Sequence, residues 1–141
     1  MNANGSAGTK QKFTVECQLG LIEYQSGDII HFPEGLYGYE EEHRYILFQH
    51  PKYLPFCWLI SLDQPNLIFP VTDPQIVMAN YHPDIKLPGD SQMLVVVTIG
   101  ESLEKVTANL RAPIIFSLDK HEARQIILDE TQYLLRHPII S

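Results

Sequence analysis

The stretch Phe13-Thr-Val-Glu-Cys-Gln-Leu-Gly-Leu-Ile-Glu-Tyr24 indicates the fold class of this chain. Phe13, Val15 and Cys17 alternate with two polar residues, which is the pattern of a strand with one buried and one solvated face. Leu19 to Tyr24 then returns as a second short apolar run, and we expect it to pair with the first as a hairpin. This stretch therefore predicts antiparallel β-structure.

The same pattern continues along the chain, because short β-branched and aromatic runs alternate with turn-forming Gly, Pro, Asn and Asp residues. The further runs are Ile29–Phe32, Tyr45–Gln49, Phe56–Leu62, Leu67–Val71, Met93–Ile99, Ala108–Phe116 and Ala123–Leu128. About nine short strands in one small domain predict an all-β, antiparallel, barrel-like fold with at most one short helix, since closure removes long unpaired edges. Leu94 to Thr98 is apolar on both faces, which predicts a position in the middle of the packed structure.

Two segments are set apart from this pattern. The first, residues 1–11, is small and polar, and we expect it to be a disordered leader before a domain over residues 12–141. The second, Leu118 to Arg136, fits either an amphipathic helix or strand. Thr131 and the β-branched pair Ile126-Ile127 favour strand.

Composition bounds the possible functions. A chain of 141 residues with 45% apolar residues can bury one core without disulfides or a structural metal. The formal net charge of -7 disfavours direct nucleic-acid binding and suits a basic protein partner. The two cysteines lack CxxC spacing, and no apolar run is long enough to span a membrane. We therefore expect a cytoplasmic protein without a membrane segment.

The sequence lacks the usual catalytic and cofactor motifs, including GxGxxG, GxxxxGK[ST], GxSxG and HExxH. The histidines are not spaced as metal ligands, so we expect no metal, no cofactor and no enzyme activity. Asp63 and Asp73 each follow an apolar run and could form the carboxylate pair of a hydrolase if both faced one cleft. Each is equally explained as a turn residue that bonds its own backbone.

The densest charge run is Glu40-Glu41-Glu42, which follows Tyr37 and Tyr39. Such a run is either a solvated loop or an acidic and aromatic patch suited to a partner with Arg or Lys. Arg111 interrupts an apolar run, so it must reach water or a buried partner; it is either an internal anchor or a polar group in a binding surface.

Several segments together resemble the flagellar assembly factor FliW family over roughly residues 12 to 138. They are His31-Phe-Pro-Glu-Gly-Leu-Tyr-Gly-Tyr-Glu40, Phe56-Cys-Trp-Leu-Ile-Ser-Leu-Asp63, Phe69-Pro-Val-Thr-Asp-Pro74, Thr107-Ala-Asn-Leu-Arg-Ala-Pro-Ile-Ile-Phe116, Gln125-Ile-Ile-Leu-Asp129 and Tyr133-Leu-Leu-Arg-His-Pro138. The chain departs from the commoner pattern at Tyr37, where a proline is frequent.

The resemblance implies a small β-barrel-like factor without catalytic activity that binds the basic translational regulator CsrA and, alternatively, flagellin. Binding would antagonise the repression of flagellin mRNA by CsrA. We expect the partner surface to comprise Glu34, Tyr37, Tyr39, Glu40, Glu41, Glu42, Asp63, Asp73, Arg111 and Arg136. The alternatives are a small-molecule-binding barrel, which requires an unfilled interior, and the Asp63/Asp73 hydrolase.

Overall fold

The computed structural model describes residues 11–100 and 105–139. The expected leader, residues 1–11, lies outside the described residues except for Gln11. The strands are β1 (Lys12–Cys17), β2 (Gly20–Gln25), β3 (Ile30–His31), β4 (Arg44–Phe48), β5 (Cys57–Ser61), β6 (Ile68–Thr72), β7 (Ser91–Thr98), β8 (Thr107–Ala108), β9 (Ile114–Ser117), β10 (Glu122–Gln125) and β11 (His137–Pro138). The helical elements are the 3-10 turns η1 (Ser26–Asp28) and η2 (Pro51–Tyr53) and the short α-helix α2 (Pro74–Val77).

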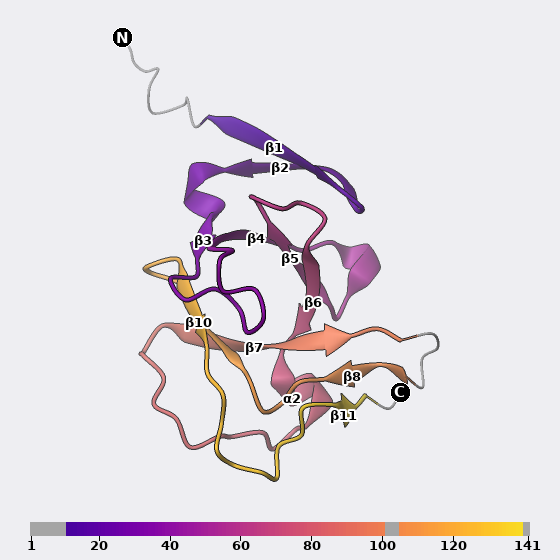
Figure 1. Ribbon diagram of the computed structural model, residues 1–141, viewed down its shortest axis with the longest axis vertical. Helices are drawn as coiled ribbons and strands as arrows, with labels where there is room; N and C mark the ends of the chain where they lie inside the picture. Colours follow the sequence, from indigo (N-terminus) through magenta and orange to yellow (C-terminus); the bar gives the residue numbers. More distant parts are fainter. Residues whose placement is uncertain (1–10, 101–104, 140–141) are drawn as a thin grey trace.

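Seven strands form a closed ring in the order β7-β6-β5-β4-β3-β10-β9, and a second pairing of β7 with β9 closes it. Figure 1 looks into this ring. Neighbouring strands are antiparallel except β10 and β3, which meet in parallel at Glu122 and His31. The predicted all-β, barrel-like fold is confirmed, with this one parallel contact added.

The interior of the ring is filled by side chains. Every second residue of the ring strands points inward, as the pleat of a strand dictates, and the inner cluster comprises Ile30, Phe32, Leu36, Tyr45, Leu59, Val71, Ile114, Phe116 and Ala123. Tyr45 and Val71 have no exposed surface, and Phe32 and Leu59 are only 1% exposed. The barrel is therefore a packed core.

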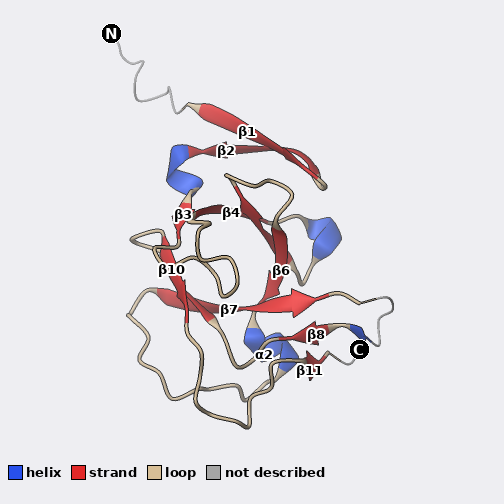
Figure 2. Ribbon diagram, viewed as in Figure 1, coloured by secondary structure: helices blue, strands red, loops and turns tan. Residues whose placement is uncertain are grey.

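Two further layers cover the outside of the barrel (Figure 2). The β1–β2 hairpin packs Val15 and Ile22 against Ile46 and Ile60, on the outer faces of β4 and β5. On the other side, α2, β8, β11 and the connecting loops bury Tyr81, Leu110, Leu128 and Tyr133 against the outer face of β7. The register of the hairpin, with Val15 opposite Ile22 and Phe13 opposite Tyr24, matches the alternation in the sequence.

Strand β7 lies between two cores. Leu94 and Val96 pack against the barrel interior, whereas Val95 and Val97 pack in the layer outside it. Both faces of the strand are covered, which explains why its sequence is apolar at successive positions. The central position predicted for Leu94 to Thr98 is confirmed.

The continuous strand expected over Ala108–Phe116 is wrong, because the chain turns between β8 and β9. The side chain of Asn109 makes this turn: its Oδ1 accepts hydrogen bonds from the backbone N–H groups of Arg111 and Ala112, each at 3.1 Å. Asn side chains favour such local bonds over a ladder, and Pro113 has no N–H to donate to one.

The segment Leu118 to Arg136 is not helical. Its ordered part is β10, and the chain continues through turns to β11. The strand expected over Ala123–Leu128 ends earlier, at Gln125. Within the described residues the α-helix is α2, where Asp73 is the N-cap and Pro74 begins the helix. No helix in the described part of the chain is long and apolar enough to cross a membrane.

Candidate functional site

The acidic loop, residues 33–43, connects β3 to β4 and holds six of the ten residues expected to bind partners. In the view into the ring, this loop is drawn across the opening (Figure 1). Leu36, at its centre, is 2% exposed and belongs to the barrel core. The loop is thus fastened to the barrel at Leu36 and presents its other side chains to solvent.

The backbone of the acidic loop folds tightly on itself. Leu36 and Tyr39 form an isolated antiparallel bridge, with the N–H of Tyr39 donating to the carbonyl of Leu36 at 2.7 Å. Gly35 has a φ of +68°, and a Cβ there would lie 2.6 Å from the Cα of Glu40. Only glycine fits this position without displacing the loop.

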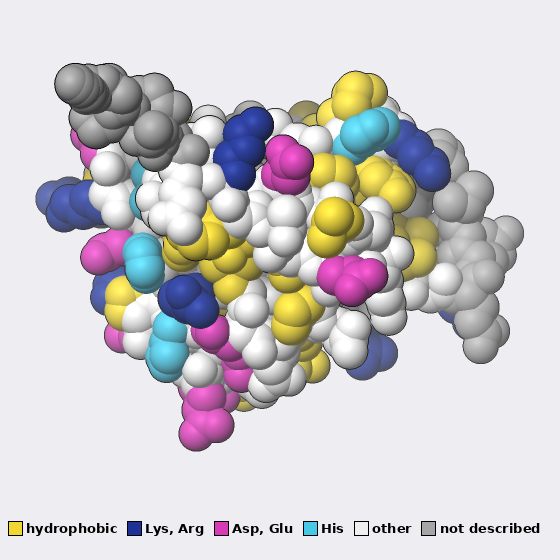
Figure 3. Space-filling model, turned by 90° about the horizontal axis from the view of Figure 1, so that it is seen from above, with side chains coloured by type: hydrophobic (Ala, Val, Ile, Leu, Met, Phe, Trp, Pro, Cys, Tyr) yellow, Lys and Arg dark blue, Asp and Glu magenta, His cyan; other side chains and the backbone are white. Residues whose placement is uncertain are grey.

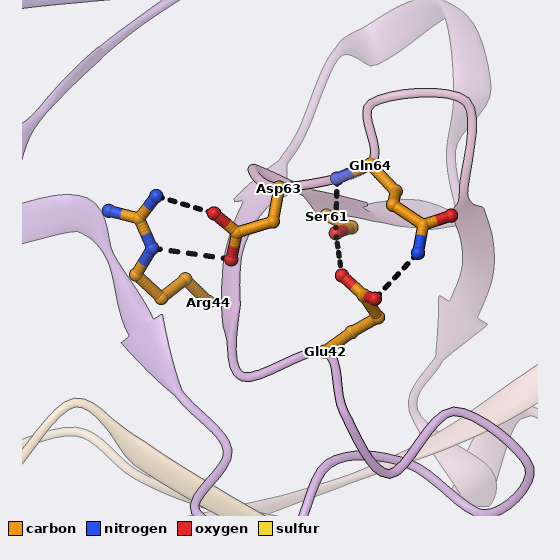
Figure 4. Close-up of polar contacts among 5 residues, drawn as sticks. All are labelled: Glu42, Arg44, Ser61, Asp63 and Gln64. Atoms are coloured by element: carbon orange, nitrogen blue, oxygen red, sulfur yellow. Dashed lines mark hydrogen bonds and ion pairs between the residues drawn. The ribbon is translucent and has the colours of Figure 1, made fainter.

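The three glutamates of the charge run have different roles. Glu40 accepts a hydrogen bond from the backbone N–H of Gly38 at 2.9 Å, and this bond holds the pKa of its carboxyl below the usual range. Glu42 accepts from the side-chain amide of Gln64 at 2.6 Å and from the hydroxyl of Ser61 at 3.4 Å (Figure 4). Glu41 is exposed. Glu40 and Glu42 therefore shape the loop, and Glu41 remains available to a partner.

The two tyrosines of the loop are also distinct. Tyr37 is 73% exposed, whereas Tyr39 is 44% exposed and its ring packs edge-on against Phe69 with centroids 5.2 Å apart. The backbone N–H of Tyr37 donates to the side-chain carbonyl of Gln125 at 2.8 Å, so its exposed ring projects from a fixed backbone.

Glu34 and Asp63 lie at the edges of this loop. Glu34 is exposed and is 3.8 Å from Arg124 of β10. Asp63 follows β5 and precedes Gln64, the residue that holds Glu42; Arg44 donates to its carboxylate at 2.7 and 3.4 Å (Figure 4). These bonds to Arg44 are the main cause that lowers the pKa of Asp63.

The structure places the other three expected residues away from the loop. Asp73 accepts from the N–H of Gln75 at 2.9 Å as the cap of α2. Arg111 donates to the carbonyls of Tyr133 at 2.8 Å and Thr131 at 3.1 Å, so it anchors the segment that leads to β11. Arg136 is exposed in the turn before β11.

The arrangement does not form a carboxylate pair. Asp63 and Asp73 follow the two antiparallel strands β5 and β6 and so lie at opposite ends of this hairpin, on the order of 13 Å apart or more. Each serves its own local structure, so they share no cleft. Among the described residues, no group of three or more His, Cys, Asp or Glu side chains could hold a metal ion.

The packed interior also bears on ligand binding. The clefts found in the described part of the chain are open ones at the surface, and the space inside the ring is occupied by the core side chains. A ligand enclosed within the barrel, as the small-molecule alternative requires, would have to displace that core.

Comparison with known proteins gives a consistent result. A family model described as "FliW protein" matches residues 14–139. The chain belongs to the FliW family. Two proteins named "Flagellar assembly factor FliW", from Caldanaerobacter subterraneus subsp. tengcongensis and Thermoanaerobacter pseudethanolicus, are each 36% identical to it; the matches cover 86% of this chain and 89% of each relative.

The fold agrees with that of a FliW family member of known structure. A solved structure titled "Crystal structure of the flagellar assembly factor FliW" superposes with a TM-score of 0.82 at 29% identity, covering 93% of this chain and 98% of that one. The resemblance to the FliW family found in the sequence is thereby confirmed, both as a family and as a barrel.

Sequence reasoning missed the residues that support the acidic loop of this FliW family member. Gln64, Phe69 and Gln125 hold Glu42, Tyr39 and Tyr37 respectively. They are distant from the loop in the sequence and follow no local pattern. The turn residues that adjoin them, such as Asp63, were the available signal.

Proposed function

We propose that this protein binds the translational regulator CsrA and, in competition with it, flagellin, as a non-enzymatic factor in the cytoplasm. Membership of a family named for flagellar assembly supports this role. The formal net charge of -7 suits a basic partner. Both cysteines are free thiols, a state that a reducing compartment preserves.

The observation that carries the proposal is the construction of the acidic loop. Its backbone is fixed by Gly35, by the bridge between Leu36 and Tyr39, and by Gln125. An exposed aromatic ring on a fixed backbone loses little entropy on binding, and tyrosine is frequent among residues that dominate interfaces. Tyr37, with Glu34 and Glu41 beside it in the loop, is therefore the proposed contact surface.

Titration calorimetry against purified CsrA, at two salt concentrations and with or without flagellin, tests this role. We expect saturable binding that weakens as salt rises, because exposed charges are screened, and a lower apparent affinity when flagellin is present. Absence of heat with both partners would contradict the proposed function.

The contact surface is tested by matched variants. Glu41→Lys should weaken CsrA binding more than Glu16→Lys, which makes the same change at an exposed position of β1. Glu42→Lys is not a suitable test, because Glu42 also holds Gln64 and Ser61. Equal affinities of the Glu41 and Glu16 variants would place the contact surface elsewhere, whether or not the protein binds CsrA.

A further inference from the structure

The ring of the barrel is incomplete at one seam, between β4 and the turn that joins β9 to β10. Strand β3 covers β4 only at the pairs Ile30–Tyr45 and His31–Arg44. Before Ile30 the chain turns away in η1, so the second half of β4 has no strand beside it on this side.

Hydrogen bonds fix which backbone groups of β4 face the seam. The carbonyl of His43 accepts from Phe32 on the β3 side at 2.8 Å, and the carbonyl of Arg44 accepts from Leu62 on the β5 side at 2.9 Å. Because successive residues of a strand face alternate sides, Leu47 presents its N–H and C=O to the β3 side. No hydrogen bond to these two groups comes from the described residues.

This strand edge lies in a cleft of about 350 Å³ between the β1–β2 hairpin and the barrel. Its apolar lining includes Ile22, Tyr24, Ile30, Phe48 and Phe116. Figure 3, which looks from the hairpin side, shows hydrophobic side chains reaching the surface in the middle of this face among charged and histidine side chains.

The charged groups of the cleft define the chemistry of an occupant. Glu23 and Asp28 line it, and the third ionisable group with a side chain at its wall, apart from Tyr24, is His121. Glu23 is exposed and only 3.9 Å from Lys12 at its nearest, and Nδ1 of His121 is buried without a hydrogen-bond partner from the described residues. The cleft thus combines an open strand edge, apolar walls and two carboxylates.

We propose that this cleft binds an extended peptide segment of a partner protein, in which apolar residues alternate with Lys or Arg. The segment would add to the edge of β4 by pairing with the backbone of Leu47. Its apolar side chains would fill the cleft, and its basic side chains would face Glu23 and Asp28. This surface is separate from the acidic loop.

The probe is the synthetic peptide acetyl-Val-Arg-Val-Arg-Val-amide, added to the full-length protein labelled with ¹⁵N. We expect saturable shifts of the amide signals around the cleft and slower hydrogen exchange at the amide of Leu47, with little change at Ile46, which faces β5. The matched acidic peptide, with Glu in place of Arg, should bind at least several-fold more weakly. Equal binding of the two peptides, or no binding, would overturn the proposal.

Two N-methylated versions of the basic peptide test the strand pairing. One carries the methyl groups on the Val residues and the other on the Arg residues. Because only one set of amides in a strand faces its neighbour, one version should lose binding by about tenfold and the other should retain it. Equal effects of the two methylations would show that the peptide does not bind as a strand.

Charge variants test the rim of the cleft. Glu23→Lys should weaken the basic peptide about two- to fivefold, as expected for an exposed ion pair. Glu16→Lys makes the same change on the neighbouring strand, away from the cleft, and should leave affinity unchanged. Equal effects would overturn the assignment of Glu23. None of these measurements uses CsrA or flagellin, so their outcome is independent of the proposed function.

Discussion

The guanidinium of Arg44 holds both carboxylate oxygens of Asp63, with Nη2 2.7 Å from Oδ1 and Nε 3.4 Å from Oδ2. The pair joins the start of β4 to the turn after β5, next to the bond between Gln64 and Glu42. It fixes the turn that supports the acidic loop. Both side chains are nearly half exposed, at 48% and 46%, so solvent screens the interaction.

This pair predicts a small, pH-dependent contribution to stability. The pKa of Asp63 is lower in the folded state than in the unfolded chain, so its contribution is present above the unfolded value of about 3.9 and is lost as the pH falls through the folded value. Asp63→Asn should therefore lower the free energy of unfolding at pH 7 by less than about 1 kcal/mol. Urea denaturation at pH 7 and pH 2.5 measures this, and a loss that is equal at both pH values would contradict it.

The two glycines of the acidic loop predict different costs of substitution. Gly38→Ala meets only the strain of a φ of +89°, since nothing lies within 4 Å of its Cβ position, and should cost about 1 kcal/mol. Gly35→Ala adds a clash with the backbone of Glu40 and should cost clearly more. Denaturant unfolding of both variants measures the difference. A Gly35 variant as stable as the Gly38 variant would show that the loop can move aside freely.

Two adjacent residues of the loop predict opposite phenotypes. Leu36→Ala removes a side chain that is 2% exposed and should reduce the free energy of unfolding by about 2–5 kcal/mol. Tyr37→Ala removes a ring that is 73% exposed and should change it by no more than about 0.5 kcal/mol. If Tyr37 anchors a partner, its variant should nevertheless bind CsrA about tenfold more weakly or worse. Thermal and calorimetric measurements on the same preparations separate the two effects.

Two buried tyrosines predict another contrast. The hydroxyl of Tyr81 donates to the carbonyl of Leu110 at 2.7 Å, and Tyr81→Phe would leave that carbonyl without this bond, at a cost of about 1–3 kcal/mol. The hydroxyl of Tyr45 is buried without a partner from the described residues, so Tyr45→Phe should be neutral or stabilising. Urea denaturation compares the pair, and a larger loss for the Tyr45 variant would indicate a partner such as bound water.

The sequence was sufficient to predict the fold where local pattern and tertiary environment agree. Phe13, Val15 and Cys17 alternate because one face of β1 packs on the barrel, and Val95 to Val97 are continuously apolar because β7 is covered on both faces. It failed where a single side chain redirects the chain. Asn109 carries no periodicity, yet its bonds to two backbone N–H groups divide the expected strand into β8 and β9.

The candidate site was less predictable. The sequence singled out Tyr37 and Glu40 to Glu42, but it could not distinguish Glu41, which is exposed, from Glu42, which bonds to Gln64 across the turn after β5. That distinction depends on contacts between distant segments, and so does the position of Asp73 and Arg111 outside the acidic loop. Charge and aromatic content identify a loop as a candidate, whereas its supports come from the fold.

The double role of β7 has a consequence for how the protein melts. Neither the barrel nor the outer C-terminal layer can lose its structure alone without exposing Val95 and Val97 or Leu94 and Val96 to water. A shared wall of this kind links the two bodies as a party wall links two houses. Heating should therefore give one calorimetric peak, and a protease should find no stable remnant of the barrel after cutting within the outer layer.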